Sequence, residues 1–322
     1  MKKARFVGDL SEDDLIRLFF LPVANGALDD DVARVLVGDE REWLVSTDSL
    51  VEDVHFLRRS PAFLVGRKAV GVNLSDIVAS GGDPRWATLS VNLPKQLPIA
   101  WVRDFAEGFR QGLTLSGCQL IGGDTGRSPD RIALNVTVIG AVEKGKSIPR
   151  SGAREGDWIG VTGFLGDSSL GLSHILGQGS LDDEQSTYFL NRHFCPPFHR
   201  SFAQAAAATV TSMMDLSDGI LTDLPRLCQA SGVRGELELS WIPISPAALA
   251  LGLTPDQAVQ GGEDYELLFT LPPKAWSTLV RVAGQQDVQI TRIGTVHGGQ
   301  GLQIRSDGRP VTLRSGAWQH FG

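Results

Sequence analysis

Several classes of protein are excluded by what this sequence lacks. Basic residues are in deficit, since 30 Lys and Arg face 37 Asp and Glu for a formal net charge of −7. Proteins that bind nucleic acid by neutralising phosphates usually carry the opposite balance, so we expect no nucleic-acid partner. The three cysteines are too few and too widely spaced for a disulfide framework or a cysteine metal site. No uncharged apolar run is long enough to span a bilayer, which predicts a cytoplasmic protein without a membrane partner.

The common signatures of nucleotide and acyl-transfer enzymes are missing as well. The chain has no Walker A loop (G-x-x-x-x-G-K-[ST]), no G-x-G-x-x-G after a strand, and no kinase-type H-R-D or D-F-G set. It also has no G-x-S-x-G, so a nucleophilic serine is not indicated. Any nucleotide chemistry must therefore use a different kind of site.

The length and the order of elements predict a two-domain α+β fold. A chain of 322 residues suggests about two domains at the usual ~150 residues each. Strand-like and helix-like segments are mixed without a regular βαβ repeat, and a long apolar helix is expected from Pro61 to Gly82. The polar segment 143–157, rich in Gly, Pro and Ser, is the best linker candidate. We predict domains of residues 1–145 and 146–322.

The sequence does contain aspartates in places where a carboxylate is costly. Asp76 is the only charge between Lys68 and Asp83, within an apolar run, and a buried carboxylate must be paired or bind a cation. Other aspartates stand beside glycine or after short apolar runs: Asp30, Asp31, Asp48, Asp124, Asp215 and Asp218. A lone aspartate is more often a turn or a helix cap. If this set converges, its repulsion requires cations, and hard oxygen ligands favour Mg²⁺ and suggest phosphates.

Two glycine pairs and one histidine add to this pattern. The segments 122–125 (GGDT) and 261–264 (GGED) are predicted to be turns that bring backbone N–H groups close to phosphate. His55 lies close in sequence to Asp48, which favours a ligand contact over the polar-core role expected for the other histidines.

Taken together, these motifs resemble the thiamine-monophosphate kinase family, within the superfamily that includes aminoimidazole ribonucleotide synthetase. The matching segments follow one another in order: 46–56 (STDSLVEDVHF), 68–76 (KAVGVNLSD), 120–125 (LIGGDT), 215–219 (DLSDG), 261–267 (GGEDYEL) and the tail 318–321 (WQHF). The combination of the first, fifth and last segments is what separates the thiamine enzymes from the rest of the superfamily.

The resemblance implies a homodimer formed through an N-terminal mixed α/β domain, a C-terminal α+β domain completing the site, and ATP-dependent phosphorylation of thiamine monophosphate. It implies several Mg²⁺ ions held by Asp30, Ser46, Thr47, Asp48, Asp76, Asp124, Asp215 and Asp218. It implies ATP contacts by Gly123, Asp124, Arg150 and Ser217, and substrate contacts by His55, Glu263 and Trp318. The choice between Asp30 and Asp31 stays open, because Asp29 replaces the glycine of the family's Gly-Asp-Asp.

The implied mechanism is direct transfer assisted by Mg²⁺, with no catalytic side chain acting as acid, base or nucleophile. The acceptor phosphate is largely ionised near neutral pH, with a second pKa of roughly 6, so no general base is required. Two alternatives remain: another ATP-using member of the superfamily, such as an amidine-forming ligase, and a non-catalytic sensor of thiamine phosphates or nucleotide.

Overall fold

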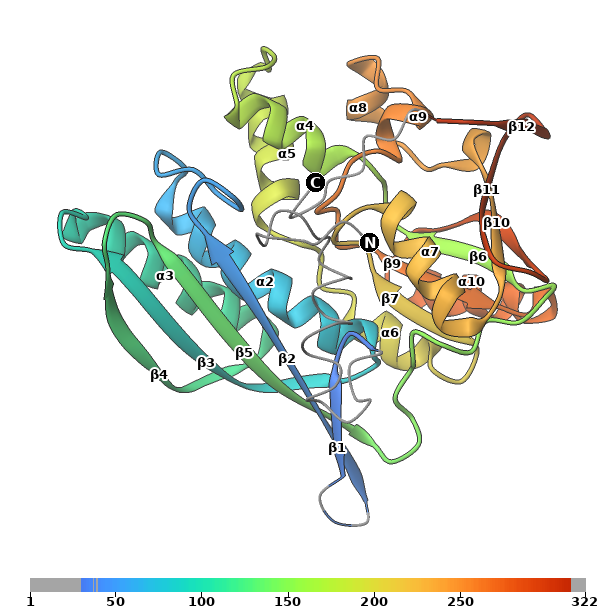
Figure 1. Ribbon diagram of the computed structural model, residues 1–322, viewed down its shortest axis with the longest axis horizontal. Coiled ribbons are helices and arrows are strands. Elements are labelled where there is room, and N and C mark those ends of the chain that lie inside the picture. Colours follow the sequence, from blue (N-terminus) through green and yellow to red (C-terminus); the bar gives the residue numbers. More distant parts are fainter. Residues whose placement is uncertain (1–29, 37, 39, 314–322) are drawn as a thin grey trace, which may run out of the picture.

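The computed structural model describes residues 30–36, 38 and 40–313, so Trp318 and the rest of the tail lie outside the described residues. Two β-sheets organise the described chain, one in each half (Figure 1). Helices and strands are mixed in both halves, and the predicted two-domain α+β class is confirmed.

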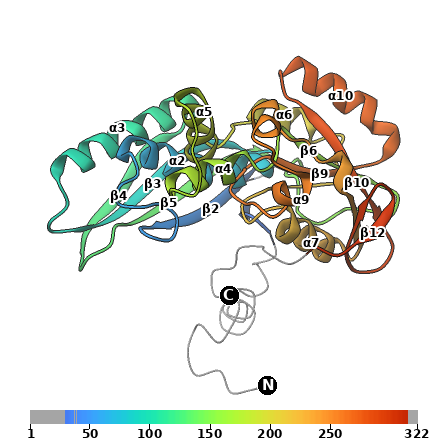
Figure 2. The same cartoon turned by 90° about the horizontal axis from the view of Figure 1, so that it is seen from above.

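The N-terminal half is a five-stranded sheet with order β1-β2-β5-β3-β4 and two helices on one face (Figure 2). Only the β3–β4 pair is parallel. The elements are β1 (Ala33–Leu36), β2 (Arg41–Val51), α2 (Ala62–Ala79), β3 (Asp83–Pro94), α3 (Ile99–Ser116), β4 (Gln119–Ser128) and β5 (Ala133–Glu143). Alternate residues of β5 are buried, as expected for a sheet with helices on one side.

The C-terminal half is a seven-stranded sheet with order β12-β11-β8-β10-β6-β9-β7. Its strands are β6 (Trp158–Thr162), β7 (Ser212–Asp215), β8 (Arg234–Glu238), β9 (Leu267–Leu271), β10 (Ile290–His297), β11 (Gly301–Ser306) and β12 (Arg309–Val311). Its helices are α4 (Asp167–Ile175), α5 (Asp183–Phe194), α6 (Arg200–Ala206), α7 (Ile220–Ser231), α8 (Pro246–Ala250), α9 (Pro255–Ala258) and α10 (Trp276–Gln285). Strand β9 is buried at every residue, because α7 covers one face of the sheet and α6 with α10 the other.

Helix α2 joins the two halves. It lies between the N-terminal sheet and the C-terminal half, where it also contacts α5, α6 and β7 (Figure 1). Most of it packs in the N-terminal core, while Val78 and Ala79 at its C-terminal end belong to the core around Phe202 and Phe269. A helix that is buried on nearly all sides needs no polar face, which explains its uncharged stretch after Lys68.

Two elements differ from their sequence-based expectation. The segment 122–125, predicted as a glycine turn, lies inside strand β4, because its backbone pairs with β3. Pro225, a residue type that usually breaks or kinks a helix, is the sixth residue of α7, where it removes a single backbone donor. Among the described residues, no helix combines the length and apolar character needed to cross a bilayer.

Helices α2 and α3 approach closely because two glycines face the partner backbone. A Cβ atom at Gly66 would overlap the carbonyl oxygen of Phe105, and one at Gly108 would overlap the carbonyl oxygen of Phe63. Neither clash could be relieved by rotating a side chain. The close packing of these helices, and with it the position of α2, therefore depends on both glycines.

We expect Gly108→Ala to lower the free energy of unfolding by about 1–3 kcal/mol, because α3 must move away from α2. Gly284 in α10 is the matched control, since a Cβ there would meet nothing within 4 Å. Gly284→Ala should raise stability by about 0.5–1 kcal/mol through helix propensity alone. Urea unfolding of both variants measures the difference; equal effects of the two substitutions would contradict the packing argument.

Candidate active site

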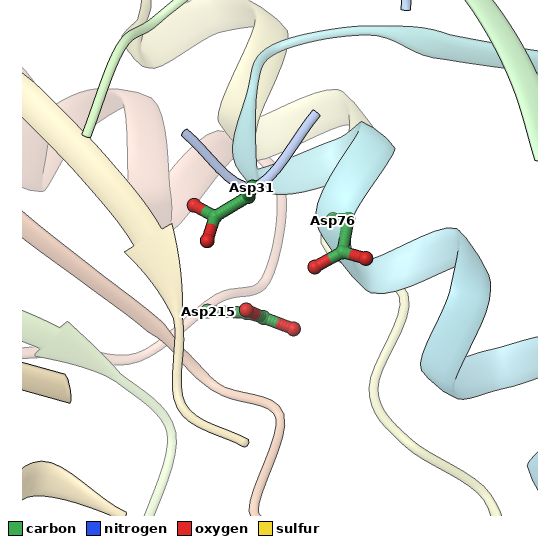
Figure 3. A group of neighbouring side chains, drawn as sticks. All are labelled: Asp31, Asp76 and Asp215. Carbon is green, nitrogen blue, oxygen red and sulfur yellow. The ribbon is translucent and has the colours of Figure 1, made fainter. Parts of the chain in front are cut away.

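Three carboxylates from both halves of the molecule meet at one point. Asp31 lies just before β1, Asp76 lies in α2, and Asp215 is the last residue of β7. One oxygen from each can be chosen so that the three lie within 4.8 Å of one another. Figure 3 shows the three side chains as close neighbours, with Asp31 and Asp76 above Asp215 in this view. Residues 184 positions apart (215 − 31) are thus brought together by the position of α2 between the two sheets.

Neighbouring polar groups hold these carboxylates in place. The Ser46 hydroxyl donates to Asp76 Oδ2 at 2.5 Å, and Ser75 donates to Asp215. Asn73 accepts a hydrogen bond from the backbone N–H of Asp48 at 2.9 Å, which ties β2 to α2. Ser46 and Asp48 are two residues apart in β2, so their side chains share the face that α2 covers. Both therefore lie beside the three carboxylates.

The electrostatics of this group are unfavourable when no cation is bound. Burial, together with repulsion from Asp215, Asp48 and Asp31, raises the pKa of Asp76 well above its usual value. Burial and the negative charges of Asp31 and Asp48 raise the pKa of Asp215 to about 7. Burial also raises the pKa of Asp31, although Arg150 opposes the shift. Each shift has the cause expected of like charges removed from water.

The structure brings Asp31, and not Asp30, into this carboxylate group. The carboxylate of Asp30 accepts a hydrogen bond from the Arg34 guanidinium at 2.5 Å and another from the backbone N–H of Arg150. Asp31 is ion-paired to the Arg150 guanidinium through one oxygen. The other oxygen, Oδ2, is buried and has no hydrogen-bond partner. Asp31 also contributes a carboxylate oxygen to the group with Asp76 and Asp215, so a cation bound there would supply the partner that this carboxylate lacks.

The residues present fit a hard divalent cation. The group offers carboxylate oxygens and no nitrogen or sulfur ligand, which is the donor set that Mg²⁺ prefers. Arg150 is ion-paired to Asp31 and also lowers the pKa of Asp215, but burial and the neighbouring carboxylates outweigh it, and the pKa values of Asp31, Asp76 and Asp215 stay raised. Magnesium is therefore chemically compatible with Asp31, Asp48, Asp76 and Asp215.

A second acidic pair lies at the start of α7. The buried carboxylate of Asp223 accepts the backbone N–H groups of Asp218 and Gly219, at 3.1 and 3.0 Å. Arg226 reaches both carboxylates, at 2.6 Å from Asp218 and 3.3 Å from Asp223. Burial and the charges of Asp218, Asp215 and Asp31 raise the pKa of Asp223 well above its usual value. Asp218 therefore lies near the three carboxylates and is held by Arg226.

Thr47, Gly123 and Asp124 do not join this group within one chain. The hydroxyl of Thr47 bonds to Thr137 on the sheet face opposite Asp48. Gly123 lies in the same cross-strand row as Asp48 but three strand spacings away, or about 14 Å. Asp124, one residue further along β4, is exposed on the face shared with Thr47. The sequence alone could not show that these three residues lie away from the carboxylate group, because their distance and face depend on the strand order.

The predicted substrate contacts His55 and Glu263 lie together, on another side of α2. Lys68 Nζ donates to the His55 carbonyl oxygen at 3.2 Å and is ion-paired to Glu263 Oε1 at 2.5 Å. The backbone N–H of Val51 donates to His55 Nδ1 at 3.0 Å, so the neutral ring carries its proton on Nε2. Tyr265 lies between this pair and the carboxylates. Burial raises the pKa of its hydroxyl most, and the negative charges of Glu263 and of the aspartates raise it further.

The loop that carries Glu263 has a strained backbone. Glu263 and Tyr265 both have positive φ, 62° and 51°, which is rare for residues other than glycine. The backbone N–H of Glu263 donates to the carbonyl of Ser217 at 2.7 Å, and a Cβ at Gly219 would overlap the Gly261 carbonyl. The two predicted glycine motifs, 215–219 and 261–267, are therefore packed backbone against backbone.

Sequence reasoning missed two functional candidates, Asp223 and Lys68. Asp223 stands in an ordinary helical context, and its sequence position gives no sign that it accepts the backbone of the 218–219 turn. Lys68 marks the start of the uncharged stretch and of the segment 68–76, but neither position predicts a role for its side chain. Its burial could have been suspected, because a lysine inside an otherwise apolar helix must find acceptors.

We predict that Asp215→Asn stabilises the metal-free protein at high pH. In the folded state the pKa of Asp215 is raised from 3.8 to about 7, so the folded protein binds more protons than the unfolded chain between these pH values. Stability must then fall as pH rises through this window. The variant should match wild type near pH 4 and exceed it by about 2–4 kcal/mol at pH 8.

Urea unfolding in EDTA at both pH values measures this effect. The exposed Asp130 provides the matched control, and Asp130→Asn should change stability at neither pH. A variant at position 215 that is less stable than wild type at pH 8 would show that the carboxylate stabilises the fold rather than straining it.

Comparison with known proteins assigns the chain to a family. Its residues 29–142 match the model "AIR synthase related protein, N-terminal domain", and residues 154–307 match the corresponding C-terminal domain. The thiamine-monophosphate kinase of Escherichia coli (strain K12) is 36% identical, over 96% of this chain and 98% of that protein. The solved structure of AaThiL complexed with AMPPCP and TMP matches with a TM-score of 0.88, at 32% identity over 99% of both chains. The crystal structure of thiamine monophosphate kinase from Aquifex aeolicus matches with a TM-score of 0.82, at 33% identity over 95% of this chain and 99% of that one. The chain therefore belongs to the thiamine-monophosphate kinase family of AIR synthase related proteins.

Proposed function

We propose that this protein transfers the γ-phosphoryl group of ATP directly to the phosphate of thiamine monophosphate, with Mg²⁺ held by the aspartates. The observation that carries the proposal is the convergence of Asp31, Asp76 and Asp215 from both halves, next to the pair His55 and Glu263. Full-length similarity to thiamine-monophosphate kinases, one of them solved with AMPPCP and TMP, supports the choice of both substrates.

The side chains divide the work between charge and position. Asp31, Asp48, Asp76 and Asp215 would hold Mg²⁺, which when bound supplies positive charge against the phosphates. Ser46, Ser75 and Asn73 orient three of these aspartates through the hydrogen bonds described above.

No side chain acts as a general base in this proposal, because the acceptor oxygen is already largely ionised at neutral pH. Arg150 and Ser217, at the edge of the acidic group, are proposed to contact ATP. His55 and Glu263 contact the organic part of the acceptor, and Trp318 remains a proposed substrate contact.

We extend the proposal to a cytoplasmic homodimer. The face of the N-terminal sheet opposite α2 and α3 carries no helix among the described residues, and the stacked rings of Trp43 and Trp86 lie on it half-buried. Pairing of two such faces would cover these side chains. Thr47 and Asp124 lie on the same face, so as proposed metal or nucleotide ligands they would act next to the second copy.

The deciding measurement is ADP release from ATP on addition of thiamine monophosphate, compared with thiamine and with other phosphate monoesters. We expect release that requires Mg²⁺ and thiamine monophosphate together. An amidine-forming ligase would release ADP only with a nitrogen donor and its own acceptor. A sensor would bind both ligands without turnover, and either result would end the proposal.

Asp76→Asn should reduce phosphoryl transfer by about a hundredfold or more, since loss of even an indirect metal partner costs 10–100-fold. The metal-free variant should melt at the same temperature as wild type or higher, because a repelling charge is removed. Single-turnover assays and thermal melts with and without Mg²⁺–ATP measure both quantities. Intact activity in a less stable protein would instead identify Asp76 as a structural residue.

A further inference from the structure

Lys68 is a fully buried lysine whose ammonium group is satisfied within the protein. Its side chain is 1% exposed, in the interior of α2. An ammonium group has three donors and no acceptor. Three acceptors surround it: the His55 carbonyl oxygen and His193 Nε2, both at 3.2 Å, and Glu263 Oε1 at 2.5 Å. The ring of Phe194 lies 5.7 Å from Nζ.

The three acceptors come from three separate segments of the chain. His55 follows β2, His193 lies in α5, and Glu263 lies in the loop before β9. Because Nε2 of His193 must accept from the ammonium, the ring proton is on Nδ1, 3.1 Å from the Ser168 hydroxyl. Lys68 therefore holds the loop of Glu263 against both the N-terminal half and α5.

Glu263 depends on this contact for its position. Its backbone has an unfavourable positive φ, so the conformation must be imposed by its surroundings. Burial raises the pKa of Glu263, but the positive charge of Lys68, followed by that of His193, lowers it below its usual value. The side chain keeps 26% exposure, so part of the carboxylate remains accessible to a ligand.

Lys68 and Asp76 are separated by eight residues of the same helix, or about 12 Å along its axis. If the phosphate of the acceptor lies at Asp76, then Lys68 and Glu263 face the opposite end of the molecule. In thiamine monophosphate that end is the aminopyrimidine, which carries an exocyclic amino group. A carboxylate can only accept hydrogen bonds, so its natural partner there is that amino group.

We propose that Lys68 is a positioning residue for substrate specificity: by fixing Glu263 in its strained conformation, it makes the enzyme recognise the aminopyrimidine of thiamine monophosphate. The proposal rests on the proposed function. Lys68 touches neither substrate; it acts through Glu263. Removing it should weaken binding of ligands that contain the aminopyrimidine and leave the binding of the thiazole phosphate part unchanged.

The test compares two ligands: thiamine monophosphate and 4-methyl-5-(2-hydroxyethyl)thiazole phosphate, which lacks the pyrimidine. Their dissociation constants are measured by calorimetry in the full chain. Lys68→Met leaves a partly buried carboxylate unpaired and can impair folding. The double variant Lys68→Met/Glu263→Gln avoids this, because it replaces the ion pair by neutral groups of similar shape.

We expect the double variant to bind thiamine monophosphate about ten- to a hundredfold more weakly, which is the usual range for loss of a hydrogen bond to a charged group. Its Kd for the thiazole phosphate and its KM for ATP should stay within about twofold of wild type. Glu263→Gln alone and Lys68→Met alone should each give the same loss as the double variant, since Lys68 acts only through Glu263.

A matched control is available one residue from His193. Arg192 is ion-paired to buried Glu266 at 2.6 Å, and Glu266 lies three residues after Glu263. Arg192→Met removes a cation of the same charge that contacts the same loop from α5, without touching Glu263. It should lower the melting temperature and leave the ratio of the two dissociation constants unchanged.

Three results would overturn the proposal: equal weakening of both ligands, wild-type affinity of Lys68→Met for thiamine monophosphate, or a changed ratio in Arg192→Met. Failure of the proposed function has a different signature. In that case wild type itself would release no ADP with thiamine monophosphate, whatever the variants bind.

Discussion

The burial of helix α2 between two sheets is the constraint on which the rest of the structure depends. A helix with protein on nearly all sides can carry polar groups only where a partner is built for each. Lys68 has three acceptors and Asn73 pairs with backbone groups, but Asp76 receives one serine hydroxyl and faces other carboxylates. The negative charge that α2 leaves without a partner is therefore concentrated at Asp76, in the candidate metal site.

The helix also sets the polarity of the site along its length. Its N-terminal half presents an ammonium to Glu263, and a little over two turns later it presents a carboxylate to Asp31 and Asp215. One end suits a neutral, hydrogen-bonding ring, and the other suits cations with phosphates. An acceptor molecule with a heteroaromatic ring at one end and a phosphate at the other matches this order.

Part of the site could be predicted from the sequence, because the signal was local. Asp76 stands out as one charge in an apolar run, and its helix was found at nearly its observed bounds. The α+β class followed from the mixture of elements. Thr47 and Asp124 could not be placed, because their face and distance depend on the strand order β2-β5-β3-β4. Asp31 and Asp30 are adjacent, and only the path of the backbone before β1 determines which one turns inward. The partners of Lys68 lie up to 195 positions away (263 − 68), so no local pattern reveals them.

Because α2 contributes to two cores, the halves of this protein do not make independent folding units. Val78 and Ala79 are covered by Phe202 and Phe269, which the chain supplies well after the linker. During synthesis the N-terminal half would emerge with this end of α2 uncovered, and it could complete its packing only once β9 had been made. The carboxylate group can then assemble only when both halves are in place, so a repelling charge cluster forms only when the rest of the molecule can hold it.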